Sequence, residues 1–105
     1  MIDLAPESLA IVRRLLAAQL PECEVRAFGS RVTGNAKPYS DLDLVLLGPA
    51  RLPLGRLAAV REAFAESDLP IRVEVIDWHS ISENFRNIIA EKSEILQSPS
   101  LPEDA

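Results

Sequence analysis

The stretch EVRAFGSRVTGNAKPYSDLDLVLL, from Glu24 to Leu47, decides the fold. Apolar and polar residues alternate over 24–28 and again over 41–47, which is the period-two pattern of half-buried β-strands. Residues 31–40 between them hold glycine, asparagine and proline and few apolar side chains, so we expect a helical turn followed by a loop. Two strands joined by a short connection therefore form the centre of the chain.

Helical periodicity flanks this stretch, with apolar residues recurring every three or four positions. We expect Asp3 to cap the first helix, and Ser80 and Glu83 have the spacing of a capping box at the start of the last one. The order predicts a small α/β or α+β sheet with helices packed on one side. The expected flanking elements are a helix over 5–20, a helix over 54–67, a strand over 71–76 and a helix over 80–96, followed by a disordered tail over 97–105.

Length and composition limit the classes of protein that fit. A chain of 105 residues is expected to form one domain, here over 1–96, and its net charge of −5 gives no basic footprint for binding nucleic acid. The sequence has neither the apolar run of about 20 residues that a membrane span needs nor a secretory signal, so we expect a cytoplasmic protein. The single cysteine, Cys23, is expected to be a semi-buried thiol before a strand.

Asp41 and Asp43 carry the first chemical signal. On a strand, two residues separated by one position share a face and lie about 6.6 Å apart, so both carboxylates can bracket two metal ions. Without metal, their repulsion is about 3 kcal/mol at ~6 Å and an effective dielectric near 20. Oxygen ligands of this kind favour Mg²⁺ or Mn²⁺. Alternatively, Asp41 caps a turn and Asp43 is a solvated strand residue.

Gly29 and Ser30 carry the second signal, because they follow a strand and open a helical turn. Backbone N–H groups and a hydroxyl at such a position favour a phosphate anion. Glycine lets the backbone approach the phosphate closely. A phosphate-binding turn ten residues before a pair of acids predicts metal-assisted chemistry on a phosphate ester.

The sequence resembles the minimal nucleotidyltransferases of the DNA polymerase β superfamily. The similar segments are AFGSRVTG at 27–34, YSDLDL at 39–44, ESDLP at 66–70, VEVIDW at 73–78 and SENFR at 82–86. The resemblance spans nearly all of the chain that we expect to be ordered. It implies a two-layer α+β fold similar to the polymerase β palm, with a small mixed sheet and helices on one face.

The resemblance also implies roles for particular residues. Gly29 and Ser30 would hold the β- and γ-phosphates of a nucleoside triphosphate, and Asp41 and Asp43 would ligate two Mg²⁺ ions. Glu74 matches the third acid of the family, which completes the metal shell and more often is Asp. Glu is one methylene longer, and a misplacement on the order of 1 Å at a reacting centre can reduce activity about 100-fold, but Glu is also an ordinary oxygen ligand and an adequate general base. Alternatively, Glu74 is a solvated acid in the middle of its strand.

Five further residues remain open at this stage. Arg31 could neutralise triphosphate charge or bind an acidic group of a partner. Lys37 could steer phosphates, or be a solvated loop lysine. Asp77 rivals Glu74 but lies on the opposite face of its strand by alternation. His79 and Trp78 fit a flanking and a packing role better than catalysis.

The resemblance finally implies a partner and a reaction. Minimal nucleotidyltransferases typically pair with a helical HEPN toxin and act as antitoxins by transferring AMP from ATP to a toxin tyrosine, which predicts a hetero-oligomer. One alternative is a binding module that neutralises its partner by occlusion, with little or no catalysis. Another is nucleotide transfer to a small hydroxylated molecule such as an aminoglycoside.

Overall fold

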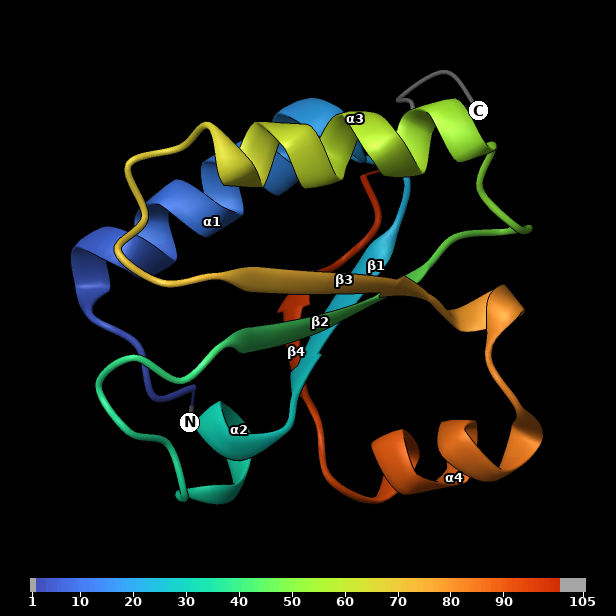
Figure 1. Cartoon of the computed structure of the whole chain (residues 1–105). Helices are drawn as coiled ribbons and strands as arrows, with labels where there is room; N and C mark the ends of the chain where they lie inside the picture. The colour runs from blue at the N-terminus through green and yellow to red at the C-terminus, as the bar shows by residue number, and fades with distance from the viewer. Residues whose placement is uncertain (1, 101–105) are drawn as a thin grey trace.

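The computed structural model describes residues 2–100 and contains one four-stranded mixed sheet (Figure 1). The strand order is β3-β2-β1-β4, in which β1 runs antiparallel to β2 and β4, and β2 runs parallel to β3. The elements are α1 (Pro6–Gln19), β1 (Glu24–Phe28), α2 (Ser30–Thr33), β2 (Leu42–Leu47), α3 (Leu54–Ala65), β3 (Val73–Asp77), the 3₁₀ turn η1 (Trp78–Ser80), α4 (Glu83–Glu91) and β4 (Glu94–Gln97). The predicted α+β class and mixed sheet are confirmed.

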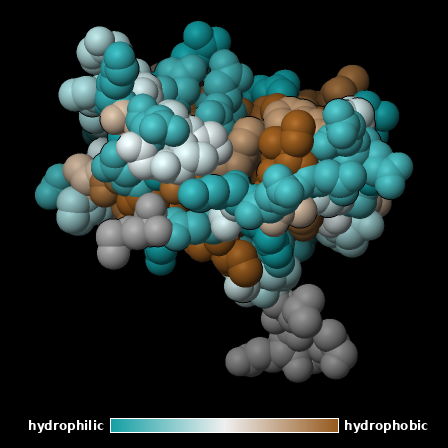
Figure 2. Space-filling model, turned by 90° about the horizontal axis from the view of Figure 1, so that it is seen from below, coloured by the Kyte–Doolittle hydropathy of each residue, from teal (hydrophilic) through white to brown (hydrophobic). Residues whose placement is uncertain are grey.

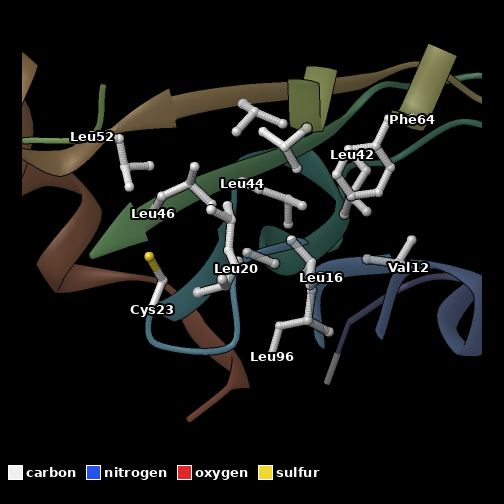
Figure 3. Close-up of a cluster of buried hydrophobic side chains, with 14 residues drawn as sticks. Val12, Leu16, Leu20, Cys23, Leu42, Leu44, Leu46, Leu52, Phe64 and Leu96 are labelled. Atoms are coloured by element: carbon white, nitrogen blue, oxygen red, sulfur yellow. The ribbon is translucent and has the colours of Figure 1, made fainter. Parts of the chain in front are cut away.

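One face of the sheet is buried under α1 and α3, which lie together above the strands in Figure 1. Leu42, Leu44 and Leu46 of β2 point into this layer and are fully buried, as the alternating pattern predicts. Figure 3 shows them facing Leu16 of α1 and Phe64 of α3. Burying every second residue of β2 on this side places Asp41 and Asp43 on the opposite face.

The opposite face carries α2 and α4, which lie below the sheet in Figure 1. Seen from below, this side is mostly hydrophilic, with separate hydrophobic patches between polar side chains (Figure 2). Phe85 of α4 packs edge-on against Phe28 at the end of β1, with ring centroids 5.9 Å apart. The two faces of the sheet thus differ in character, one forming the core and the other being more open.

The first helix is not capped as predicted. Its N-cap is Ala5, which makes no side-chain hydrogen bond, and Pro6 occupies the first turn. The backbone N–H of Asp3 instead donates to the carbonyl of Arg31 at 2.7 Å. Asp3 therefore connects the N-terminal segment to α2 through its backbone and does not cap α1.

The prediction of one helix over 80–96 is wrong in both its start and its end. The N-cap is Ser82, whose hydroxyl accepts from the backbone N–H of Phe85, while the hydroxyl of Ser80 donates to the carbonyl of Asp77. The helix ends at Glu91, and β4 then pairs with β1. A fourth strand therefore replaces the last turns of the expected helix.

The expected tail lies partly outside the described residues. Gln97 is the last residue of β4, and its side-chain amide donates to the carbonyls of Leu20 and Cys23. The N–H of Ser100 donates to the carbonyl of Pro21 at 2.7 Å. Residues 101–105 are not described, so the prediction of a disordered tail is not tested there.

Candidate active site

The carboxylates of Asp43 and Glu74 belong to neighbouring positions on adjacent strands. Asp43 on β2 is in register with Glu74 on β3 and with Phe28 on β1. Side chains in register on neighbouring strands point to the same face of a sheet. Asp41 directly precedes β2 and shares that face by alternation. The structure thus brings together the three acids that the sequence singled out.

The electrostatics of Asp43 reflect this crowding. Burial raises the pKa of the Asp43 carboxyl above its usual range, and the negative charges of Asp41 and Glu74 raise it further. The sign of both effects disfavours the ionised form. A divalent cation beside these carboxylates would offset the repulsion.

The donor set fits a hard divalent cation. Three carboxylates supply only oxygen ligands, which suits Mg²⁺. Within residues 2–100, however, no group of three His, Cys, Asp or Glu side chains is placed so that it could hold a metal ion. Glu74 is half-exposed and lies 3.3 Å from the guanidinium of Arg72, while its negative charge already acts on Asp43. The acids therefore form an open set of candidate ligands.

Gly29 controls how closely the chain approaches Asp43. Its backbone has φ 81° and ψ −159°, a region that is essentially restricted to glycine. A Cβ built on Gly29 would collide with Oδ2 of Asp43. We expected this glycine to admit a phosphate; the structure adds a second reason, because the Asp43 carboxylate occupies the space that any side chain would need. Ser30 follows as the first residue of α2.

Arg31 does not have the role that we expected. Its side chain is buried, with 6% exposed, and its guanidinium donates to four backbone carbonyls. A guanidinium held in this way is not presented to a triphosphate or to the acid of a partner, so both predicted roles are wrong. Arg31 instead fixes the loop that leads into Asp41, and the carbonyls that it holds belong to Asp3, Lys37, Pro38 and Ser40.

Asp77 is a structural residue, as strand alternation predicts. Its carboxylate is buried on the core side and accepts hydrogen bonds from the backbone N–H groups of Leu52, at 2.8 Å, and His79, at 3.0 Å. The His79 ring in turn lies 2.8 Å from the carbonyl of Gly48. These contacts fasten η1 to the loop between β2 and α3, and they leave Glu74 as the acid that faces Asp43.

Two neighbouring features complete the description of the candidate residues. Lys37 is exposed in the loop before the acids, which agrees with the prediction that it is a solvated loop lysine. Trp78 packs under the guanidinium of Arg86, 5.4 Å from the ring centroid, which supports its predicted packing role.

Sequence reasoning gave no role to two residues that touch this site. Phe85 contacts Phe28, the residue in register with Asp43. Arg72 holds Glu74. The alternation of β3 could have found Arg72, because it places Arg72 and Glu74 on one face, whereas the contact of Phe85 depends on the tertiary position of α4.

Residues 9–97 match the family described as "Nucleotidyltransferase domain". The chain belongs to this nucleotidyltransferase family. It is 46% identical over 96 residues to the probable protein adenylyltransferase MntA of Haemophilus influenzae, across 91% of this chain and 84% of that relative. The family assignment therefore makes this chain an enzyme of the nucleotidyltransferase type.

Solved structures share the fold of this nucleotidyltransferase. A crystal structure of a toxin-antitoxin with AMP-PNP matches with a TM-score of 0.73 and 22% identity, over 91% of this chain and 77% of that chain. A tri-AMPylated Shewanella oneidensis HEPN toxin in complex with MNT antitoxin matches with a TM-score of 0.66 and 20% identity, over 90% and 71% of the two chains. Among residues 2–100, no helix is long and apolar enough to cross a membrane.

Proposed function

We propose that this nucleotidyltransferase uses ATP and Mg²⁺ to transfer AMP to a tyrosine hydroxyl of a helical HEPN-type toxin, and so acts as its antitoxin. The observation that carries the proposal is the apposition of Asp43 and Glu74 on adjacent strands, next to a glycine whose backbone makes room for the Asp43 carboxylate. The 46% identity to a probable protein adenylyltransferase supports a protein acceptor.

In the proposed reaction, the bonds form and break between the tyrosine and ATP, and the residues of the chain hold the metal and the phosphates. The tyrosine oxygen forms a bond to the α-phosphorus of ATP, the bond from that phosphorus to the oxygen bridging to the β-phosphate breaks, and pyrophosphate leaves. Asp41, Asp43 and Glu74 would hold Mg²⁺, which when bound neutralises phosphate charge and makes the hydroxyl a better nucleophile. The turn at Gly29 and Ser30 would hold the β- and γ-phosphates.

Glu74 would also accept the proton of the attacking hydroxyl. Its carboxylate is half-exposed on the outermost strand of the sheet, where an incoming acceptor can reach it. The Arg72 side chain is 75% exposed and can release Glu74 with little loss, because exposed ion pairs contribute about 0 to 1 kcal/mol.

The first test combines ligand binding with transfer. Thermal unfolding is measured with Mg²⁺ alone, ATP alone and both, and AMP transfer to a co-purified HEPN protein is followed by mass spectrometry. Ligand at 100 times its dissociation constant stabilises the folded state by about 2.7 kcal/mol, a shift on the order of 10 °C for a domain of this size. We expect this shift to require both ligands and to be lost, together with transfer, in Asp43→Asn.

Asp68→Asn is a matched control, since Asp68 is an exposed acid in the turn between α3 and β3. It should keep both the shift and the transfer. Full transfer by Asp43→Asn would refute the assignment of the metal site.

A second candidate function rests on the ion pair between Arg72 and Glu74. If this pair persists in the complex, Arg72 keeps the Glu74 carboxylate engaged, and the chain neutralises its partner by occlusion alone. Inhibition of the toxin that survives in Asp43→Asn, without any AMP on the toxin, would favour this alternative.

A further inference from the structure

Within the described residues 2–100, no strand pairs with the outer edge of β3, which lies beside the candidate active site. β3 is the last strand in the order β3-β2-β1-β4 and pairs with β2 on its inner side (Figure 1). The carbonyl of Arg72 points inward and accepts from the N–H of Leu42. Because backbone groups alternate along a strand, those of Val73 and Val75 point outward. The guanidinium of Arg61 confirms this direction, since it donates to the carbonyl of Val75 at 2.8 Å.

A cavity of about 400 Å³ lies along this edge, between the end of α3 and β3. Most of its lining residues are apolar, and Arg61 and Arg72 line it too. Glu74 lines the cavity too, so the cavity reaches one of the three candidate acids. The apolar lining residues are Phe64, Ala65, Leu69, Ile71, Val73 and Val75.

These features specify one kind of occupant. An unpaired edge offers hydrogen bonds to an extended chain, and pockets beside the edge select its alternate side chains. Two arginines and one acid, Glu74, line the cavity, so its charged lining residues carry a net positive charge, which favours an acidic segment at this place. An extended segment paired with β3 would place one residue beside Glu74, on the same face as its carboxylate.

We propose that the acceptor segment adds as an extended strand to the outer edge of β3, with its tyrosine beside Glu74. This inference rests on the proposed function and names how that site selects its acceptor. Adjacent side chains of the segment point to opposite faces, so the residues on either side of the tyrosine enter the apolar cavity. The next residues outward return to the carboxylate face, where an acidic side chain replaces Glu74 as the ion-pair partner of Arg72. Arg61 covers the carbonyl of Val75 until the segment replaces it.

The test uses two synthetic peptides of equal length and charge. One carries the core Glu-Val-Tyr-Val-Glu and the other carries Glu-Ser-Tyr-Ser-Glu, both with blocked ends. The full chain is incubated with ATP, Mg²⁺ and each peptide, and AMP addition is measured by mass spectrometry. We expect the valine peptide to be modified at least tenfold faster, because its apolar side chains fill the cavity. Equal rates for the two peptides would overturn the inference.

Two alanines of α3 provide a matched pair of variants. Ala65 is exposed and lines the cavity, so Ala65→Phe fills it, whereas Ala59 is exposed on the same helix and does not line it. Ala65→Phe should lose the preference for valine, and Ala59→Phe should keep it. Both variants should retain the stabilisation by ATP and Mg²⁺, which shows that each is folded and binds nucleotide.

Amide hydrogen exchange reports the pairing itself. With AMP-PNP, Mg²⁺ and the valine peptide, the outward N–H groups of Val73 and Val75 should become protected, while that of Glu74, which faces β2, should change little. An unchanged Val73 amide at saturating peptide would overturn strand addition.

Failure of the inference is distinguishable from failure of the proposed function. If the chain modifies a HEPN protein but neither peptide at millimolar concentration, the inference is wrong and the proposed function stands. If it modifies neither the HEPN protein nor the peptides, both are wrong.

Discussion

Replacing Gly29 by alanine tests whether this glycine exists to admit the Asp43 carboxylate. The substitution adds one methyl group at a backbone position with φ 81° and ψ −159°. The new Cβ would collide with Oδ2 of Asp43 and would lie 3.3 Å from its Cγ. Either the backbone leaves this conformation or the carboxylate moves, and both changes disturb the candidate metal site.

Gly29→Ala is expected to reduce both the stability and the activity of the chain. A non-glycine residue in this backbone region costs of order 1 to 3 kcal/mol. For a domain of about 100 residues, each kcal/mol lowers the Tm by about 4 to 8 °C. Moving a reacting group by about 1 Å can reduce activity about 100-fold. Gly29→Ala should therefore lower both the Tm and the rate of AMP transfer.

Gly34→Ala is the matched control, because Gly34 also has a positive φ of 88° but no atom within 4 Å of an added Cβ. Its left-handed backbone should cost about 1 to 2 kcal/mol without displacing any acid. We expect Gly34→Ala to lose stability and to keep its response to ATP and Mg²⁺.

The decisive assay is a double-mutant cycle between Gly29→Ala and Asp43→Ala, measured by urea unfolding without metal. Truncating Asp43 removes the colliding oxygen, so the two changes should couple by about 0.5 to 3 kcal/mol. Additive effects, or equal losses of Tm and nucleotide response in Gly29→Ala and Gly34→Ala, would refute the reasoning.

Three further predictions concern residues around the site. Arg31→Lys keeps the charge but loses the planar fork that holds four carbonyls, and should lower stability by about 2 kcal/mol or more in urea unfolding and weaken the ATP–Mg²⁺ shift. Asp77→Asn leaves one buried N–H facing an amide donor, and should cost about 1 to 3 kcal/mol in the same assay with the ligand shift retained. Burial raises the pKa of the Cys23 thiol, so the folded chain keeps this proton to a higher pH than the unfolded chain. Stability should fall as the pH rises above about 8.5, less so in Cys23→Ala, and thiol reagents should react slowly until the protein unfolds.

The central strands could be predicted from the sequence because each is buried on one face. Alternation located β1 over Glu24–Phe28 and placed Asp41 and Asp43 opposite the leucines of β2. The same alternation separated Glu74 from Asp77 on β3. One-sided burial leaves a period of two in the sequence, and this period determines which side chains share a face.

The fourth strand could not be predicted in this way. Ile88, Ile89, Ile95 and Leu96 continue a helical spacing, and neither glycine nor proline separates α4 from β4. β4 has four residues, and its pairing partner β1 lies about 70 positions earlier in the chain. A short edge strand of this kind is determined by tertiary pairing, which overrides local propensity.

The role of Arg31 was likewise hidden, because the same sequence pattern fits an exposed phosphate ligand and a buried structural cation. Only the fold shows that carbonyls from Asp3 and from the 37–40 loop converge on its guanidinium. Arg31 and Gly29 therefore each help to position one of the two aspartates. Arg31 fixes the loop that enters Asp41, and Gly29 leaves space for Asp43.

The surroundings of the Asp43 carboxyl reduce the stability of the folded chain. Its carboxyl is partly buried beside two other acids, its pKa is raised for that reason, and the adjoining backbone adopts a conformation suited to glycine. An asparagine at 43 would relieve the repulsion with little change in volume, so folding alone gives no reason for this aspartate. Groups that reduce stability in this manner are typical of functional sites, because a ligand supplies the missing counter-charge. The electrostatic cost at Asp43 is therefore what is expected of a residue that binds a ligand, independently of the similarity to other nucleotidyltransferases.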